Sequence, residues 1–374
     1  MGKRGNGEGG ITHLSDGRWQ ARITLEGGRR KAFYGATRAE AAAKLTAALR
    51  DRDKGLPIVA EKQTIENYLV NWLVSVKPAI RPRTWQRYGE LLTLHVVPTL
   101  GKTTLVRLTA QQVQALYGYK LGEGLSRTTA HHLHAVLHRA LAQAERLGLV
   151  ARNVCDLVEA PRMAEREMQV LARGQVRHLL DMANNDRLAA LYVLAVSTGM
   201  RQGELLALRW RDVDFATGSV QVRATVQRTR EYGLTLAPPK TKQSRRRIKL
   251  GTVALEALRT HRTRQVEERL QSGPAWDGRL DLVFANEIGR PIEAQNLVRR
   301  SFYPLLQRAA LPRIRFHDLR HTAATLLLSS GINPKIVSEM LGHASITITL
   351  GIYSHVLPEM QAQAAAAMDA ALGM

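Results

Sequence analysis

"FHDLRHTAATLLLSSGINPKIVSEMLGH", residues 316–343, predicts two consecutive helices separated by a tight turn. The first is expected to stop at Gly331, because glycine readily adopts the left-handed conformation that closes many helix C-termini. The second is expected to begin after an N-cap, Asn333, with Pro334 in its first turn, and to end at Gly342. Start and stop signals that agree in this way indicate a well-defined pair of helices.

The overlapping stretch "LGHASITITLGIYSH", residues 341–355, carries a different local signal. Its segment ITIT, residues 346–349, alternates β-branched residues and taken alone favours a strand. In such a strand Tyr353 would be an ordinary core aromatic. Whether this tyrosine packs or reacts has to be decided by the chemistry of the rest of the chain.

The composition predicts a basic, cytoplasmic protein. The chain has 374 residues, and 54 Lys and Arg against 32 Asp and Glu give a formal charge of +22. This predicts a polyanionic partner, usually nucleic acid; a solvated basic surface and a membrane surface are the alternatives. The single cysteine, Cys155, excludes an internal disulfide framework and a multi-cysteine zinc site. Without a signal peptide or a long apolar run, we expect a soluble protein, nucleoid-associated when bound to DNA, with no membrane partner.

Residues 1–55 are expected to form a small module of three strands and one helix. The stretch "RWQARITL", residues 18–25, alternates apolar and polar residues. The apolar set is Trp19, Ala21, Ile23 and Leu25, and the polar set is Arg18, Gln20, Arg22 and Thr24. The alternation predicts one face in a core and one basic, polar face. The helix is expected to begin after an N-cap at Thr37. Because it is so short, this unit is expected to be a binding module.

Two further regions complete a multidomain chain that we expect to be mainly α with small β-sheets. Residues 62–152 have helical periodicity and predict an all-α domain. Residues 168–374 mix helical runs with short β-rich stretches and predict a mixed α+β domain with a C-terminal, alanine-rich tail. Segments rich in charge and proline, without periodicity, are expected to be the linkers between the regions.

Separated stretches of the last region carry side chains suited to phosphoryl chemistry. They are Arg201 and Glu204, Lys240 within "PPKTKQSRRRIKL", His317 and Arg320, and His343 and Tyr353. A phosphodiester in its transition state spreads negative charge over its non-bridging oxygens, and guanidinium groups can clamp these oxygens without a metal. A tyrosine is a weak nucleophile until positive charge and a histidine stabilise its phenolate, and a lysine can protonate the leaving oxygen. The set therefore predicts phosphoryl transfer through a covalent phosphotyrosine.

At these residues the sequence resembles the tyrosine recombinase, or phage integrase, family. The matching stretches are "TGMRQGELLALRW", "KTKQSRRRIKL", "FHDLRHTAATLLLSSGINPKIVSEMLGH" and "YSHV", within about residues 170–357. The resemblance implies the following roles: Arg201 and Arg320 bind the scissile phosphate, His317 and His343 hydrogen-bond it and assist proton transfer, Lys240 is the general acid, Tyr353 is the nucleophile, and Glu204 supports the site. Lys242, on the same turn as Lys240, stays an alternative for the acid. The family's counterpart of residues 345–353 is helical, so we expect a helix there, with Ser345 as a candidate N-cap.

The resemblance also implies a function, partners and an assembly. It implies a site-specific recombinase that integrates and excises a phage or mobile element through a 3′-phosphotyrosyl link. Residues 62–152 resemble a core-site DNA-binding domain, and residues 1–55 an AP2-like arm-binding module. The candidate DNA contacts are Arg18, Arg22, Arg29, Arg30, Arg83 and Arg87. The implied partners are double-stranded DNA, three further copies of the chain in a tetramer, and accessory DNA-bending proteins; no metal or cofactor is implied. The tail either packs on a neighbouring protomer or forms an ordinary helix.

Several alternatives stay open at this point. The same tyrosine chemistry could serve strand swivelling, as in type IB topoisomerases, and a catalytically silent DNA-binding regulator is the alternative from another class. His134 and His138 lie one helical turn apart, a spacing that suits zinc, but we expect no metal there because the sequence offers no neighbouring carboxylate or cysteine to complete a site. We expect His321 and His355 to be structural residues.

Overall fold

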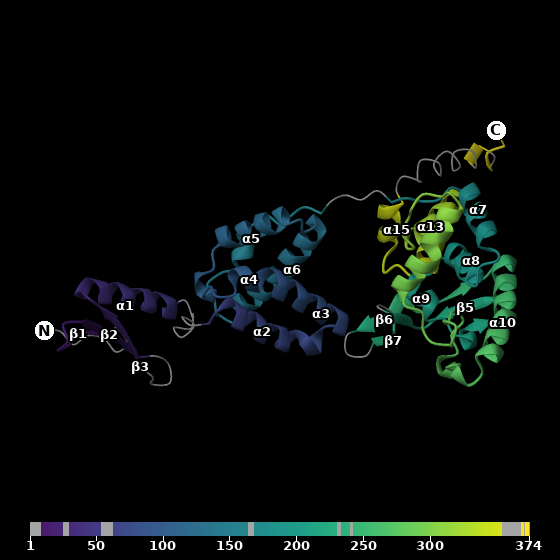
Figure 1. Ribbon diagram of the computed structural model, residues 1–374. Helices are drawn as coiled ribbons and strands as arrows, with labels where there is room; N and C mark the ends of the chain where they lie inside the picture. Colours follow the sequence, from purple (N-terminus) through teal and green to yellow (C-terminus); the bar gives the residue numbers. More distant parts are fainter. Residues whose placement is uncertain are drawn as a thin grey trace. The chain divides into compact units, whose positions relative to one another are not determined.

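The computed structural model describes residues 9–24, 30–53, 63–163, 168–229, 233–239, 242–353, 368–369 and 371–373. The chain divides into two compact units, residues 1–165 and 166–374, and each is described by itself. Figure 1 labels the elements of both units. The finer limits 1–55, 62–152 and 168–374 stay predictions.

The N-terminal part of the first unit is a three-stranded antiparallel sheet packed against one helix. The strands are β1 Gly10–His13, β2 Trp19–Thr24 and β3 Arg30–Gly35, with β2 in the centre, and the helix is α1 Arg38–Asp53. Ala21 and Ile23 of β2 are buried against Ala41 and Leu45 of α1, as the alternation predicts. The backbone N–H of Glu40 donates to Thr37 Oγ1 at 3.2 Å, so Thr37 caps α1 as expected. Leu25 lies outside the described residues.

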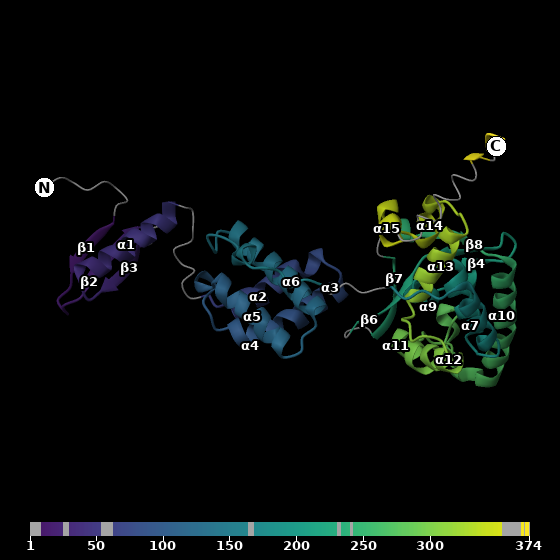
Figure 2. The same ribbon diagram turned by 90° about the horizontal axis from the view of Figure 1, so that it is seen from above.

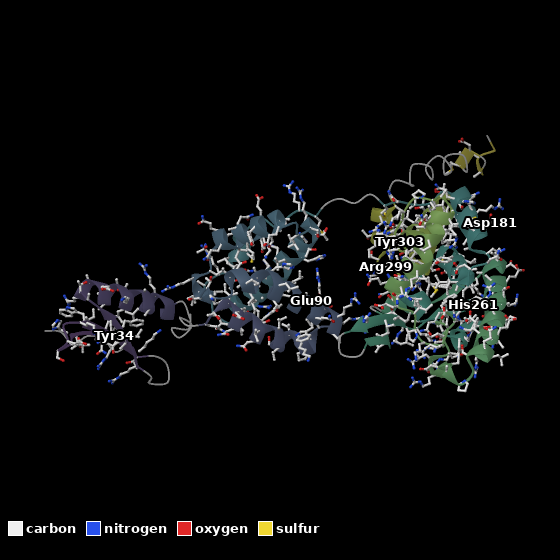
Figure 3. The ribbon with its side chains drawn as sticks, viewed as in Figure 1. Tyr34, Glu90, Asp181, His261, Arg299 and Tyr303 are labelled. Carbon is white, nitrogen blue, oxygen red and sulfur yellow. The ribbon has the colours of Figure 1, made fainter. Side chains whose placement is uncertain are left out.

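Two details of this module go beyond what the sequence indicates. Gln20 belongs to the polar face of β2, as predicted, yet it is buried, and its Nε2 donates to the hydroxyl of Tyr34 on β3 at 2.7 Å. The cause is that β2 is the central strand, so side chains from its neighbours cover its outer face; Tyr34 is labelled in Figure 3. In addition, α1 continues to Asp53, three residues into the stretch DRDKGLPIVAEKQT, residues 51–64, which lacks helical periodicity and is expected to be a linker.

The second part of the first unit is helical, as its periodicity predicts. Its helices are α2 Ile65–Val76, α3 Pro82–Leu91, α4 Val97–Leu100, α5 Ala110–Gly122 and α6 Arg127–Arg146, with a π-helical turn at Leu92–Val96 and a 3₁₀ turn at Val154–Leu157. Side-chain caps at Thr64, Thr109 and Ser126 begin three of them. The apolar faces share one core, in which the Tyr68 hydroxyl donates to the Ala140 carbonyl at 2.6 Å.

The second unit surrounds one buried helix with further helices and a small sheet. The helices are α7 Arg173–Ala183, α8 Ala189–Thr198, α9 Gln202–Leu206, α10 Thr252–Ser272, α11 Ala294–Leu297, α12 Tyr303–Arg308, α13 Asp318–Ser329, α14 Pro334–Leu341 and α15 Ile346–Ile352. The strands are β4 Val213–Asp214, β5 Ser219–Val222, β6 Thr225–Thr229, β7 Gly233–Ala237 and β8 Arg246–Lys249. They form an antiparallel sheet in the order β4-β5-β8 and a separate β6-β7 hairpin. Helix α8 packs against α7, α10 and α13 (Figure 1). Figure 2 shows α10, α11, α12 and α14 of the same unit from above.

The helix caps and the helix end predicted for the C-terminal helices are present in the structure. Asn333 Oδ1 accepts from the backbone N–H of Lys335 at 2.8 Å, and Gly342 ends α14 with φ +68°. Residues 346–352 are helical, as the family resemblance implies, and Ser345 Oγ accepts from the Thr347 N–H at 3.1 Å. The local strand signal of ITIT is therefore overridden by a capped helix that packs on α14.

The structure bears in part on two further expectations, the absence of a membrane-spanning segment and the helical tail. No helix among the described residues is long and apolar enough to cross a membrane. The alanine-rich tail lies mostly outside the described residues; Met368 and Asp369 are in helical conformation.

Candidate active site

Glu204 and two arginines form the base of the candidate site. Arg201 precedes α9, and its N–H and Nη1 donate to the two carboxylate oxygens of Glu204 at 3.0 and 2.8 Å. Arg246 reaches the same carboxylate from β8, with Nη2 donating at 2.9 Å. Burial alone would raise the pKa of Glu204, but the charges and hydrogen bonds of Arg246 and Arg201 lower it below its ordinary value. An ionised Glu204 therefore holds two guanidinium groups in place.

The turn after α14 is tied to this base. Arg201 Nη2 donates to the Gly342 carbonyl at 3.3 Å, and Arg246 Nε donates to the Met340 carbonyl at 2.5 Å. A Cβ at Gly342 would lie 3.0 Å from Arg246 Cδ, and its positive φ also favours glycine. Gly342 is therefore needed for both the turn and the close approach of Arg246, and it fixes the position of His343 beside the arginines.

Arg320 presents a guanidinium that is only partly satisfied. It lies in the first turn of α13, is 4% exposed, and donates through Nη1 to the Gly199 carbonyl at 2.7 Å. Its buried Nη2 has no hydrogen-bond partner among the described residues. Burial, followed by the charges of Arg201 and Arg246, lowers the pKa of Arg320 to about 9. An anion at this point would satisfy the free donor and relieve the crowding of positive charge.

The two predicted histidines differ in their surroundings. His343 is half-buried, and its Nδ1 lies 2.7 Å from Thr349 Oγ1 on α15. Burial and the charges of Arg320 and Arg201 lower the pKa of His343 to about 4. His317, the residue before α13, is exposed, and desolvation and the neighbouring His321 and Arg320 lower its pKa. At neutral pH both rings are neutral, so each can donate from one nitrogen and accept at the other.

Tyr353 is buried at the C-terminal end of α15. It is 1% exposed and packs in a small apolar cluster with Ala324, Leu328, Val337 and Leu341. Its hydroxyl lies 2.8 Å from Nδ1 of His321 on α13. Burial raises the pKa of Tyr353 to about 12, against the lowering effect of the Arg320 charge. In this state of the chain the tyrosine is protonated, so its activation needs further positive charge or a base.

Other predicted site residues are placed less completely. Lys240 lies outside the described residues, and Lys242 is described only through the backbone of a short 3₁₀ turn. Of the predicted DNA contacts, Arg18 pairs with Asp16 at 2.6 Å and lies over the Tyr34 ring, and Arg87 lies 3.7 Å from Glu90. Arg22 and Arg30 are exposed on β2 and β3, Arg83 is exposed on α3, and Arg29 lies outside the described residues. All six stay predictions.

Two residues at the site had not been singled out from the sequence. Arg246 lies in the basic run "SRRRIKL", and only its inward position on β8 distinguishes it from Arg245 and Arg247. His321 was expected to be structural, yet it contacts the Tyr353 hydroxyl. Its spacing of four residues from His317 places both rings on one face of α13, and this was the available signal. His355 lies outside the described residues.

The histidine pair of α6 is satisfied by protein groups. His134 Nδ1 lies 3.2 Å from the Tyr117 hydroxyl, and His138 Nε2 lies 2.6 Å from Asp156 Oδ1. The statement that no carboxylate lies near this pair is wrong, because the chain folds back after α6 and brings Asp156 to His138. Within the described part of the chain, no three His, Cys, Asp or Glu side chains are placed to hold a metal ion.

Comparison with known protein families decides the identity of the chain. Residues 169–360 match the model of the phage integrase family, and residues 64–121 match the N-terminal SAM-like domain of phage integrases. The chain belongs to the phage integrase family. The members of this family, the tyrosine recombinases, cleave and rejoin DNA, so the chain is a site-specific recombinase.

Individual relatives extend the match over nearly the whole chain. A tyrosine recombinase XerC-like protein of Caldanaerobacter subterraneus is 31% identical, covering 94% of this chain and 96% of the relative. An integrase of Streptomyces ambofaciens is also 31% identical, covering 98% of this chain and 97% of the relative. Further relatives include a putative prophage integrase of Mycobacterium tuberculosis, 29% identical over 93% of this chain. The homologues are thus site-specific recombinases and integrases, and this chain is an integrase of the same kind.

Solved structures of integrases share the fold. The Tn1549 transposon integrase in complex with transposon right end DNA has a TM-score of 0.70 at 22% identity, covering 83% of this chain and all of that one. The lambda integrase tetramer bound to a Holliday junction has a TM-score of 0.58 at 19% identity, covering 90% of this chain and 96% of that one. The mainly helical, multidomain fold with small antiparallel sheets is therefore confirmed.

Proposed function

We propose that this integrase cuts one DNA strand at a time through attack of Tyr353 on a phosphodiester. The reaction forms a 3′-phosphotyrosyl bond and releases a 5′-hydroxyl. Because the phosphotyrosyl bond conserves the energy of the broken phosphodiester, religation to a second strand needs no ATP. Arg201 and Arg320 would clamp the non-bridging oxygens, and His317 and His343 would hydrogen-bond the phosphate and assist proton transfer.

The free donor of Arg320 is the observation that carries this proposal. A buried guanidinium nitrogen without a partner costs free energy, about 1–3 kcal/mol for an unsatisfied polar group, and such sites persist where a ligand supplies the acceptor. Arg201, Arg246 and His343 surround it with positive charge and hydrogen-bond donors. Glu204 pairs with both Arg201 and Arg246, so these ion pairs fix the positions of the two guanidinium groups. A phosphate with two non-bridging oxygens fits this arrangement.

The leaving oxygen needs a proton, and we assign this role to Lys240. The hairpin β6-β7 ends at Ala237, three residues before Lys240, and β8 returns the chain to Arg246 at the base of the site. Positive charge nearby lowers the pKa of a lysine, and a lowered pKa suits a general acid that works near neutral pH. Lys242 is the second candidate, because it lies on the same connection.

We propose double-stranded DNA as the partner and a tetramer as the active assembly. The chain carries a formal charge of +22, and the lambda integrase relative has been solved as a tetramer on a Holliday junction. Residues 62–152 would bind the core site together with residues 168–374. Residues 1–55 would bind a second, arm-type site, with Arg18, Arg22 and Arg30 on the sheet as contacts. Bridging two DNA segments would favour integration and excision of an element over simple strand swivelling.

The decisive experiment incubates the protein with a nicked duplex that carries its core site and traps the covalent complex on a denaturing gel. The attachment site is then identified by mass spectrometry. We expect the Tyr353→Phe variant to form no complex while binding DNA with unchanged affinity. Tyr303→Phe is the matched control, because Tyr303 lies in the same unit (Figure 3), its ring is covered by the Arg313 guanidinium, and it is none of the residues of the candidate site.

Two outcomes would contradict the proposal. A covalent link to another tyrosine would exclude Tyr353 as the nucleophile. Loss of the complex in EDTA, at a DNA concentration that saturates binding, would indicate that a metal ion is needed in place of the arginine clamp. Unchanged cleavage in EDTA is expected, since guanidinium groups supply the charge stabilisation.

A further inference from the structure

His321 lies closer to the nucleophile than either histidine singled out from the sequence. Its Nδ1 is 2.8 Å from the Tyr353 hydroxyl, and the two rings have centroids 5.9 Å apart. No other hydrogen bond of this hydroxyl is found among the described residues. His343 Nδ1 is already engaged by Thr349 Oγ1, and the exposed His317 ring contacts His321 edge-on at 5.1 Å. Of the three imidazoles, His321 is the one with a nitrogen at the reacting oxygen.

We propose that His321 is the general base that accepts the hydroxyl proton of Tyr353 as the tyrosine attacks the phosphate. The inference rests on the proposed function, because it needs Tyr353 to be the nucleophile. It adds a catalytic residue that none of the assigned roles includes.

The proton and bond balance of the step is complete. Neutral His321, with its hydrogen on Nε2, accepts the Tyr353 proton at Nδ1 while the phenolic oxygen forms its bond to phosphorus. The bond from phosphorus to the 5′-oxygen breaks, and this oxygen takes a proton from the general acid, proposed as Lys240. In religation the 5′-hydroxyl attacks phosphorus and gives its proton back to Lys240. The bond from phosphorus to the tyrosine oxygen breaks, and this oxygen takes the proton from the His321 imidazolium. No oxidant, metal or cofactor enters the step.

The groups around His321 favour its neutral form, which a base requires. The charged and titratable groups that face it are Asp318, Arg315, Arg320 and His317 on or beside α13, His343 after α14, and Tyr353 at the end of α15. Burial lowers the pKa of His321, Asp318 raises it, and Arg315 and Arg320 lower it further, so the net direction is downward. The ring is therefore neutral at pH 7. Once His321 is protonated, its imidazolium and the Asp318 carboxylate attract each other.

The first test separates proton acceptance from positioning. His321→Asn places an amide oxygen near the position of Nδ1, so it can accept the tyrosine hydrogen bond but cannot take the proton. We expect cleavage of the nicked duplex to slow by ~10²–10⁴-fold, the usual contribution of a general base, while the affinity for DNA stays unchanged. His178→Asn is the matched control, because His178 is exposed on α7. Cleavage by His321→Asn within threefold of the unmodified protein would show that His321 only holds the tyrosine, and would overturn the proposal.

A second test distinguishes the base from the acid. A duplex with a bridging sulfur in place of the 5′-oxygen releases a thiolate, which needs no proton because thiols have a pKa of about 8.5. On this substrate Lys240→Ala should recover most of its cleavage rate, whereas His321→Asn should stay slow. Recovery of His321→Asn on the sulfur substrate would assign His321 to protonation of the leaving group and overturn its role as base. Mapping the covalent link in the unmodified protein tests Tyr353 independently, so failure of the proposed function and failure of this inference give different results.

Discussion

The two halves of the candidate site are held in contrasting ways. The half proposed to bind phosphate is interlocked: Glu204 joins Arg201 to Arg246, and both arginines donate to carbonyls of the α14 turn. The half that holds the proposed nucleophile, called the nucleophile half below, rests on apolar packing and one side-chain hydrogen bond, between Tyr353 and His321. An anion-binding site must be preorganised to stabilise a transition state, whereas a buried nucleophile has to become accessible to DNA. We infer that the first half is built before DNA binds and that the second is adjusted on binding.

Among the substitutions that test this contrast, Arg320→Ala, at the centre of the interlocked half, is expected to have the largest effect. Loss of one preorganised donor typically costs about 2.7–4 kcal/mol of transition-state stabilisation, or 10²–10³ in rate. Because Arg320 also fills a buried position, we expect a loss of cleavage at or above this range. The measurement is the single-turnover rate of covalent complex formation at saturating DNA.

Arg313→Ala is the control for Arg320→Ala. Arg313 lies over the Tyr303 ring and outside the proposed clamp. If Arg313→Ala reduced cleavage as much as Arg320→Ala, the effect would reflect the loss of positive charge from this unit and not the loss of a phosphate ligand.

Glu204→Gln should weaken the interlocked half itself. The buried carboxylate pairs with Arg201 and Arg246, and removing one partner of a buried ion pair usually costs about 3–5 kcal/mol. Since the amide keeps some hydrogen bonds, we expect the lower end of this range, measured by denaturant unfolding of residues 166–374 within the full chain. Cleavage should fall as well, because Arg201 would lose its fixed orientation.

The stability contributed by Glu204 should also depend on pH in a defined direction. Its pKa is lower in the folded chain than in the unfolded chain, so its contribution is fully present above the unfolded value. The reference pKa of glutamate is about 4.3. The stability contribution of Glu204 therefore begins to fall below about this pH and is lost as the pH passes through the lower pKa of the folded chain. In Glu204→Gln this part of the acid sensitivity should disappear; an identical acid unfolding curve for both proteins would show that the carboxylate is not ionised in the fold.

The contrast between the two halves also explains which parts could be predicted from sequence. Local signals were sufficient where the chain itself closes the hydrogen bonds, as at the Asn333 cap and the Gly342 helix end. They failed at the ITIT segment, where β-branched residues favoured a strand but the Ser345 cap and packing on α14 select a helix. The burial of Gln20 on the polar face of β2 could not be predicted, because coverage by a neighbouring strand is not a local property.

The roles of Arg246 and His321 illustrate the same limit at the site. Three consecutive arginines look alike in sequence, and only the pleat of β8 directs Arg246 inward to Glu204. For His321, the four-residue spacing from His317 indicated a shared helix face, but the contact with Tyr353 depends on how α15 packs near α13. Arg201, Arg320, His343 and Tyr353, in contrast, were identified by their motifs, and the structure places these residues around one charged site.

The smallest expected effect is that of Gly351→Ala in the nucleophile half. A Cβ at this exposed position of α15 would meet nothing within 4 Å, so the substitution adds no clash. Alanine favours helix over glycine by about 0.8–1.0 kcal/mol, which should stabilise the last turn before Tyr353. If Tyr353 must move from its packed position to reach DNA, this stabilisation should slow covalent complex formation by a few fold while hydrogen exchange at the Tyr353 amide becomes slower. Slower exchange together with faster cleavage would mean that a loose end of α15 limits the reaction. In that case Tyr353 would need to be held more firmly for attack, which contradicts the proposed contrast between the two halves.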